Sequence, residues 1–194
     1  DLHSFPTRRS SDLVVVSSRK RILRAGDIVS LDFGAVFQGF YGDAAITVSV
    51  GDTSARKEAL MRVTEEALYK GIEQARIGNR VSDISSAVQT HAEAAGFSVV
   101  RQYVGHGVGT HLHEAPEVPN YVDSRSKSSP RLQEGMVIAI EPMINMGTHQ
   151  VKVLDNGWTV VTADRLPSAH FEHSVAITAN GPYILSQLGG ASGS

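Results

Sequence analysis

Five side chains that can bind a metal ion recur along the sequence, each inside a short apolar or glycine-bounded segment. They are Asp32, Asp43, His106, Glu141 and Glu172. Four carboxylates that converge in an apolar sheet repel one another strongly unless cations neutralise them. Two divalent ions balance four negative charges, and one imidazole completes the ligand set. The pattern therefore predicts a hydrolytic site that uses two metal ions.

Taken one at a time, these five residues give weak signals. Asp32 and Asp43 fit almost equally well as solvated acids beside a turn, although Asp32 lies in an apolar run where a lone charge is unfavourable. An isolated histidine is more often a hydrogen-bonded structural residue than a ligand. Each glutamate at the end of an apolar strand is only suggestive. The combination of all five favours the metal site.

The glycine-rich segment around His106 allows a close approach of the backbone to a ligand. It lacks the lysine and the helix-opening pattern of a phosphate-binding loop, so that interpretation is rejected. We interpret His111 as a structural histidine. We expect His170 and His173, which flank Glu172, to lie at the surface or behind the ligands.

The composition is that of one ordinary globular domain, with 194 residues, 41% hydrophobic and 20% charged. A net charge of −2 disfavours binding to nucleic acid. Without cysteine, disulfides and thiolate metal sites are excluded, which fits a cytoplasmic location. No apolar run approaches the ~18 residues of a membrane span.

The metal-binding residues need a scaffold, which the hydrophobic pattern predicts to be α+β. Residues 28–36 and 44–50 form a hairpin whose turn, centred between Phe37 and Gln38, places Asp32 opposite Asp43. A helix capped by Thr53 or Ser54 runs to about residue 77, and a second one is capped by Ser82 and ends at Gly96. Further strands are expected at 98–104, 136–140, 150–154, 158–162 and 173–177, with a polar loop at 123–130.

The hairpin aspartates, together with the segments GHGVGTHLHEAP, EPM and FEH, resemble type I methionine aminopeptidases of the pita-bread metallopeptidase superfamily. This resemblance extends from about Val14 to the end of the chain. It implies a curved antiparallel sheet with helices on its outer face. It also implies an enzyme that removes the initiator methionine from peptides and nascent proteins.

The resemblance assigns a role to each site residue. Asp32 is then a terminal ligand of one ion, Asp43 and Glu172 bridge both ions, and His106 and Glu141 complete the other ion. Glu141 is also the group that accepts a proton from water, and His113 contacts the substrate carbonyl. Leu112 and Trp158 line the methionine pocket. The ligand chemistry is compatible with Co, Mn, Fe or Zn.

The sequence departs from the family at its beginning. Residues 1–13 resemble a translated DNA-sequencing adapter, so we expect a non-native or disordered leader, a catalytic domain at 14–188 and a flexible tail at 189–194. VVVSSRKR replaces the family stretch that carries an upstream catalytic histidine. The N-terminal helical pair of the family is missing too. We therefore expect reduced or absent activity.

Three other interpretations fit the sequence less well. A proline-specific or creatinase-like peptidase of the same fold usually carries a large N-terminal domain. A catalytically impaired binding protein of this fold would have lost ligands. A structural calcium site would not favour a histidine ligand. We further expect a monomer that makes transient contact with the ribosome and binds neither membranes nor nucleic acid.

Overall fold

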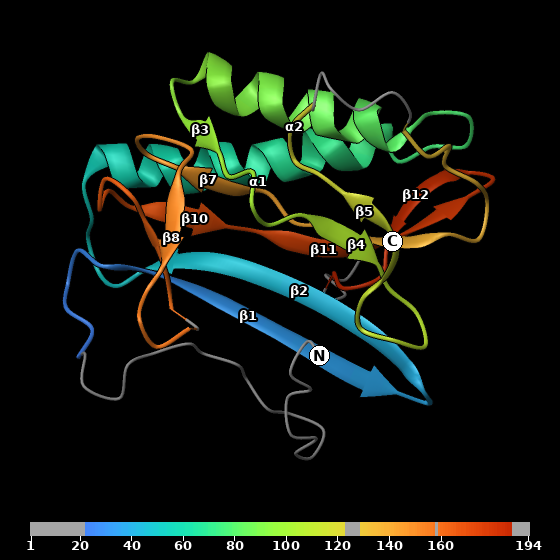
Figure 1. The fold of residues 1–194 in the computed structure, drawn as a ribbon, viewed down its shortest axis with the longest axis horizontal. Helices are drawn as coiled ribbons and strands as arrows, with labels where there is room; N and C mark the ends of the chain where they lie inside the picture. Colours follow the sequence, from blue (N-terminus) through green and yellow to red (C-terminus); the bar gives the residue numbers. More distant parts are fainter. Residues whose placement is uncertain (1–21, 123–128, 158, 188–194) are drawn as a thin grey trace, which may run out of the picture.

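The computed structural model describes residues 22–122, 129–157 and 159–187. Within this part of the chain, two helices cover one face of a curved antiparallel sheet, and a hairpin at residues 28–49 forms one edge of that sheet (Figure 1). This arrangement confirms the α+β class. The leader at 1–13, Trp158, the tail at 189–194 and most of the loop at 123–130 lie outside the described residues.

The hairpin consists of β1 (Ile28–Phe37) and β2 (Phe40–Ser49), joined by Gln38 and Gly39. Both turn residues have positive φ, 50° and 84°, which is the backbone of a type I′ turn. The turn therefore centres one residue later than predicted, and Asp32 faces Ala45 rather than Asp43. The predicted direct pairing is wrong. Asp43 is a diagonal neighbour of Asp32 and lies on the same face, because side chains alternate along a strand.

The two predicted helices are present. Helix α1 (Ala55–Gln74) begins after Ser54, whose side chain accepts a hydrogen bond from the Lys57 N–H, as predicted. Helix α2 (Val81–Ala94) has Arg80 rather than the predicted Ser82 as its N-cap. The N–H of Ser82 instead donates to Ser129 Oγ, at 2.8 Å, so a distant segment satisfies a donor that a local cap would have satisfied.

The strands after the helices are more numerous than predicted, and all of the predicted ones except that at 173–177 are shorter. They are β3 (Ser98–Val99), β4 (Gly105–Gly107), β5 (Glu114–Val118), β6 (Val137–Ile140), β7 (Met143–Asn145), β8 (Val151–Val153), β9 (Val160–Thr162), β10 (Ser168–His170), β11 (Glu172–Thr178) and β12 (Gly181–Ile184). The predicted strand at 98–104 is wrong in extent, since only β3 forms there. Strands β4, β5, β7, β10 and β12 were not predicted.

All strand pairs are antiparallel. The main sheet has the order β1-β2-β11-β6-β4-β5, with β12 also paired to β11. A second sheet has the order β10-β7-β3, and β8 pairs with β9. Strand β11 therefore lies in the middle of the main sheet, between the hairpin and β6.

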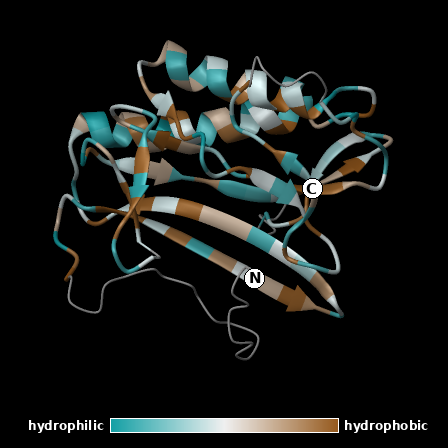
Figure 2. Cartoon of the chain, viewed as in Figure 1, coloured by the Kyte–Doolittle hydropathy of each residue, from teal (hydrophilic) through white to brown (hydrophobic). Residues whose placement is uncertain are grey.

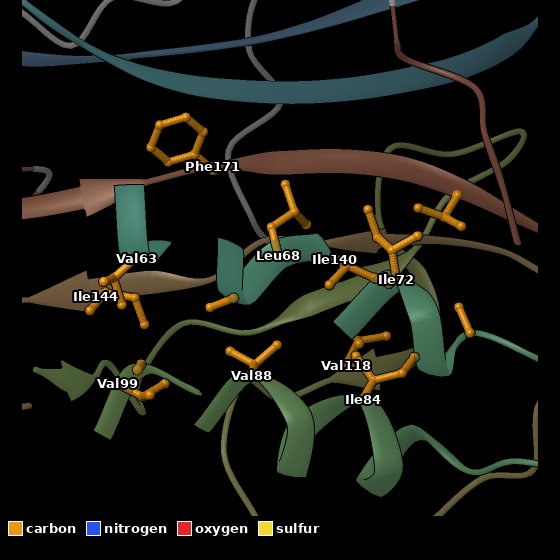
Figure 3. Packing of buried hydrophobic residues seen from close by; sticks show 14 of the residues in the cluster. Val63, Leu68, Ile72, Ile84, Val88, Val99, Val118, Ile140, Ile144 and Phe171 are labelled. Atoms are coloured by element: carbon orange, nitrogen blue, oxygen red, sulfur yellow. The ribbon is translucent and has the colours of Figure 1, made fainter. Parts of the chain in front are cut away.

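The hydrophobic core fills the space between the helices and the sheets (Figure 3). Helix α1 contributes Val63, Leu68 and Ile72, and α2 contributes Ile84 and Val88. Opposite them lie Val99, Val118, Ile140, Ile144 and Phe171 from the strands and their junctions. Burial of this apolar surface fixes the strands that carry the predicted ligands.

Hydrophilic residues alternate with hydrophobic ones along both helices, whereas the hairpin carries hydrophobic residues towards its tip (Figure 2). At that tip Val36, Phe37 and Phe40 are exposed. Among the described residues, no helix combines the length and the apolar character needed to cross a membrane.

Candidate metal centre

Two breaks in the sheets place the predicted glutamates next to each other. Glu141 and Pro142 interrupt the path from β6 to β7, and Phe171 interrupts the path from β10 to β11 just before Glu172. The two breaks lie side by side, since the Phe171 N–H donates to the Pro142 carbonyl at 3.4 Å. Both carboxylates therefore belong to one region of the sheet.

His106 lies in β4, between two glycines that leave no room for a side chain. A Cβ atom at Gly105 would overlap the carbonyl oxygen of Ala139, and one at Gly107 would overlap that of Ala115. Neighbouring strands thus press closely on both sides of His106, which is 8% exposed. The sequence predicted a close approach of this backbone to a ligand, whereas the structure shows that the two glycines allow a close approach of neighbouring strands.

The side chains of Asp43, His106 and Glu172 converge, with one potential ligand atom from each within 4.8 Å of the others. Glu141 joins them, because its Oε1 lies 3.5 Å from His106 Nε2. Asp43 Oδ2 lies 3.9 Å from the same nitrogen. The structure thus brings four of the five predicted ligands together in a largely buried cluster.

Asp32, the fifth predicted ligand, lies at the open side of this cluster. Its side chain is 53% exposed, and its Oδ2 lies 4.0 Å from His170 Nδ1. Proximity to the cluster is evident in the electrostatics, since the negative charge of Asp32 helps to raise the pKa of Asp43. The apolar neighbours of Asp32 in sequence did not imply burial of its own carboxylate.

Three of these carboxylates, those of Glu172, Asp43 and Asp32, have a raised pKa and hold their protons more tightly than ordinary carboxylates. Burial, followed by the charges of Asp43, Glu141 and Asp32, raises the pKa of Glu172 well above its usual value. Burial and the charge of Asp32 raise the pKa of Asp43. For Asp32, whose side chain is 53% exposed, partial desolvation by the surrounding protein is the largest cause of a raised pKa. The site therefore lacks positive charge to balance its acids.

The hydrogen bonding of His106 indicates the sign of the charge that a ligand bound in this cluster would carry. Its Nδ1 lies 2.9 Å from the carbonyl oxygen of Gly107, which can only accept, so Nδ1 carries the proton. In the neutral ring Nε2 is then a bare lone pair facing the oxygens of Asp43 and Glu141. Glu172 Oε1 is also buried and has no hydrogen-bond partner among the described residues. Converging acceptors of this kind fit a divalent cation, and oxygen-rich ligation with one imidazole suits a transition metal.

His113 and Leu112 lie on the loop between β4 and β5, at the rim of the cluster. The His113 ring packs edge-on against the His106 ring, with centroids 4.3 Å apart. Burial and the neighbouring His106 lower the pKa of His113, which favours its neutral form. Leu112 lies beside Gly34 of β1, where a Cβ would be 3.5 Å from its Cδ1. Trp158, the other predicted pocket residue, is outside the described residues.

Three further residues contact the site. Two of them were not predicted from the sequence, and the third, His170, was not predicted to be a ligand. The His170 ring is 14% exposed and faces Glu141. Ser174 Oγ both accepts from the Asp43 N–H and donates to the Asp43 carbonyl, each at 2.9 Å. Asn120 Nδ2 donates to the Glu141 carbonyl at 3.0 Å. Only His170 carried a usable signal, because a residue two positions before Glu172 shares its face in extended backbone.

Comparison with known proteins connects this geometry to a family. The sequence matches the metallopeptidase family M24 over residues 3–179. Methionine aminopeptidase of Clostridium perfringens is 56% identical over 86% of this chain and 66% of its own length. Methionine aminopeptidase 1 of Bacillus subtilis is 52% identical over 87% of this chain and 67% of its own length. The chain thus spans about two thirds of the length of these relatives.

A crystal structure of methionine aminopeptidase from Thermotoga maritima superposes with a TM-score of 0.82. It is 47% identical, over 88% of this chain and 68% of that one. The arrangement of helices and curved sheet is therefore the pita-bread fold of these enzymes. From its sequence, its fold and its cluster of acids and histidine, the chain belongs to metallopeptidase family M24.

Proposed function

We propose that this protein is a methionine aminopeptidase that hydrolyses the peptide bond after an N-terminal methionine and uses two divalent metal ions. The observation that carries the proposal is the buried convergence of Asp43, His106 and Glu172, whose ligand atoms lie within 4.8 Å of one another. Identity of about half to the bacterial methionine aminopeptidases supports the choice of substrate.

Five residues of the chain would hold the ions. Asp43 and Glu172 would be shared between the ions, Asp32 would bind on the exposed side, and His106 and Glu141 would bind on the buried side. Divalent ions bound here would neutralise the carboxylates, lower the pKa of a water molecule so that hydroxide is available at neutral pH, and polarise the scissile carbonyl. Co, Mn, Fe and Zn all suit this ligand set.

The remaining steps fall to side chains of the chain itself. Glu141 accepts the proton of the attacking water and passes it to the leaving amine, since its carboxylate lies within the cluster. His113 donates a hydrogen bond to the developing oxyanion, an interaction that is stronger in the transition state than in the bound substrate. Leu112 and Trp158 form the apolar wall that accepts the methionine side chain.

A comparison of two peptides tests this proposal. The protein, reconstituted with Mn²⁺ or Co²⁺, is incubated with Met-Ala-Ser and with Ala-Pro-Phe, and free amino acid is measured by chromatography. We expect methionine release from Met-Ala-Ser, and a fall to the metal-free rate in Asp43→Ala and Glu172→Ala. Asp52→Ala, which removes an exposed carboxylate, is the matched control.

Three outcomes would contradict the proposal. Cleavage that survives Asp43→Ala or Glu172→Ala would remove the two-metal mechanism. Preference for Ala-Pro-Phe would favour a proline-specific peptidase of the same fold. A protein that holds no divalent ion at saturating Mn²⁺ or Co²⁺ would be a binding protein on this scaffold.

The proposed activity also implies where in the cell the protein acts. Initiator methionine is removed from chains as they are made, so the protein would act in the cytoplasm, as a monomer in transient contact with the ribosome. Cell fractionation and sedimentation with ribosomes in growing cells would test this setting.

A further inference from the structure

His170 occupies a position between two of the proposed ligands. Its Nε2 lies 3.6 Å from Glu141 Oε2, and its Nδ1 lies 4.0 Å from Asp32 Oδ2. The ring is 14% exposed, and Nε2 is buried without a hydrogen-bond partner among the described residues. Buried polar atoms of this kind normally have a partner. The charged group that faces this nitrogen is the Glu141 carboxylate.

The backbone of His170 is held firmly in place. Thr47 Oγ1 donates to the His170 carbonyl at 2.8 Å and accepts from the His170 N–H at 2.9 Å. Ser30 Oγ lies 2.8 Å from the same Thr47 oxygen. These contacts tie β10 to the hairpin that carries Asp32 and Asp43. The direction of the His170 side chain is therefore set by the same strands that set the ligands.

The two oxygens of Glu141 face two different imidazoles. Oε1 lies 3.5 Å from His106 Nε2, the lone-pair nitrogen of the proposed metal ligand, and Oε2 faces His170. A carboxylate in this position is oriented to bind an ion through one oxygen when its other oxygen is held by a hydrogen bond. The 3.6 Å separation is a few tenths longer than a hydrogen bond, so a small rotation of either side chain closes it.

We propose that His170 is a positioning residue that donates a hydrogen bond from Nε2 to Glu141 Oε2 and thereby directs Glu141 Oε1 at the ion beside His106. This inference rests on the metal site proposed above. Groups that hold metal ligands through hydrogen bonds fix ligand orientation, and their loss typically weakens metal binding about 10–100-fold. His170 is not itself a ligand in this arrangement.

Three variants of the full chain test this role. Mn²⁺ and Co²⁺ affinities are measured by isothermal titration calorimetry, together with the visible spectrum of the Co²⁺ form. We expect His170→Ala to weaken binding about 10–100-fold. In contrast, His170→Gln is expected to retain most of the affinity, because its amide N–H can replace the donor. His173→Ala is the matched control, since His173 bonds to Ser186 Oγ at 2.8 Å and does not face the cluster.

The outcomes separate this inference from the proposed function. If the unmodified protein binds no ion, the metal site itself is wrong, and the inference fails with it. If it binds ions and His170→Ala leaves the affinity unchanged, only the positioning role is wrong. If His170→Gln loses as much affinity as His170→Ala and both change the Co²⁺ spectrum, His170 is a ligand and the positioning role is again overturned. Circular dichroism and thermal melts check that each variant is folded.

Discussion

Replacement of Glu172 by glutamine is expected to raise the free energy of unfolding of the metal-free protein. In the presence of metal, the same replacement is expected to lower it. The carboxylate is 2% exposed and lies in a cluster with Asp43, where potential ligand atoms are within 4.8 Å of one another. At that separation and an effective dielectric constant of about 20, two unit charges repel by about 3.5 kcal/mol. Glutamine fills nearly the same volume and removes this repulsion.

In the metal-free protein the benefit of glutamine grows with pH. Because the pKa of Glu172 is raised, its carboxyl group holds a proton more tightly in the folded than in the unfolded chain. The stability from this proton is complete below the ordinary glutamate pKa and is lost as pH rises through the raised pKa. Glu172→Gln has no carboxyl group to deprotonate at this position, so its stability does not fall in this way as pH rises. We expect it to be more stable than the unmodified protein by about 1–3 kcal/mol near pH 8, and by little near pH 5.

With metal the order reverses. An ion present at about 1,000 times its dissociation constant stabilises the protein that binds it by about 4.1 kcal/mol, more than the advantage of about 1–3 kcal/mol that glutamine has without metal. Glu172→Gln loses a proposed bridging ligand and with it much of this gain. The assay is urea unfolding in EDTA and in Mn²⁺, from about pH 5 to pH 8. For a chain of this size, each kcal/mol also moves the melting temperature by about 2–4 °C.

The matched control is Glu117→Gln, which neutralises an exposed glutamate on β5 and is expected to change stability by less than about 0.5 kcal/mol. If Glu172→Gln is less stable than the unmodified protein in EDTA near pH 8, the carboxylate is satisfied rather than repelled. The electrostatic reasoning would then be refuted, whatever happens in the presence of Mn²⁺.

Three further predictions concern other parts of the structure. His113→Ala is expected to lower kcat by about 10²–10³-fold, since it removes a donor to the oxyanion, while Mn²⁺ affinity stays unchanged. Gly71→Ala places a Cβ 2.9 Å from Val88 Cγ2 in the core, so urea unfolding should report a loss of about 1–3 kcal/mol. Hydrogen bonds from backbone N–H groups, that of Leu166 first, lower the pKa of Asp164. Its contribution to stability is therefore present above the ordinary aspartate pKa and lost as pH falls through the lowered pKa, so Asp164→Asn should destabilise near neutral pH but not in acid.

Each of these has its own check. His111→Ala alters an exposed histidine on the same loop, and an equal loss of kcat there would mean that the loop rather than His113 matters. Val88→Ala should relieve Gly71→Ala in a double-mutant cycle, and additive losses would rule out the proposed overlap. For Asp164, a destabilisation that persists unchanged at low pH would show that the charge is not responsible.

The sequence was sufficient to find the cluster because its acids interrupt apolar strands. Glu141 and Glu172 each stand where a buried strand breaks, and His106 stands between glycines. Such positions are unfavourable for a charged or polar side chain without a partner, so the residue types alone were informative. The same logic overestimated the burial of Asp32, whose strand is at the sheet edge and leaves its side chain half exposed.

Features that depend on distant contacts could not be predicted. The N-terminus of α2 is completed by Ser129 and Pro130, from a segment about fifty residues away, rather than by Ser82. Strands β7 and β10 are three residues long, too short for an alternating pattern, and β5 contains a proline. The hairpin register was missed because Gln38, an unusual residue for positive φ, occupies the first turn position.

The two-residue tip at Gln38 and Gly39 gives the geometry of the cluster an unexpected dependence on loop length. Since successive side chains in a strand point to opposite sides, one inserted residue that shifted the pairing by a single step would turn Asp43 outward while Asp32 stayed in place. The residue count at the tip is therefore fixed, and its two positions favour residues that tolerate positive φ. An engineer could graft new recognition sequences onto this loop only in exchanges that conserve the spacing.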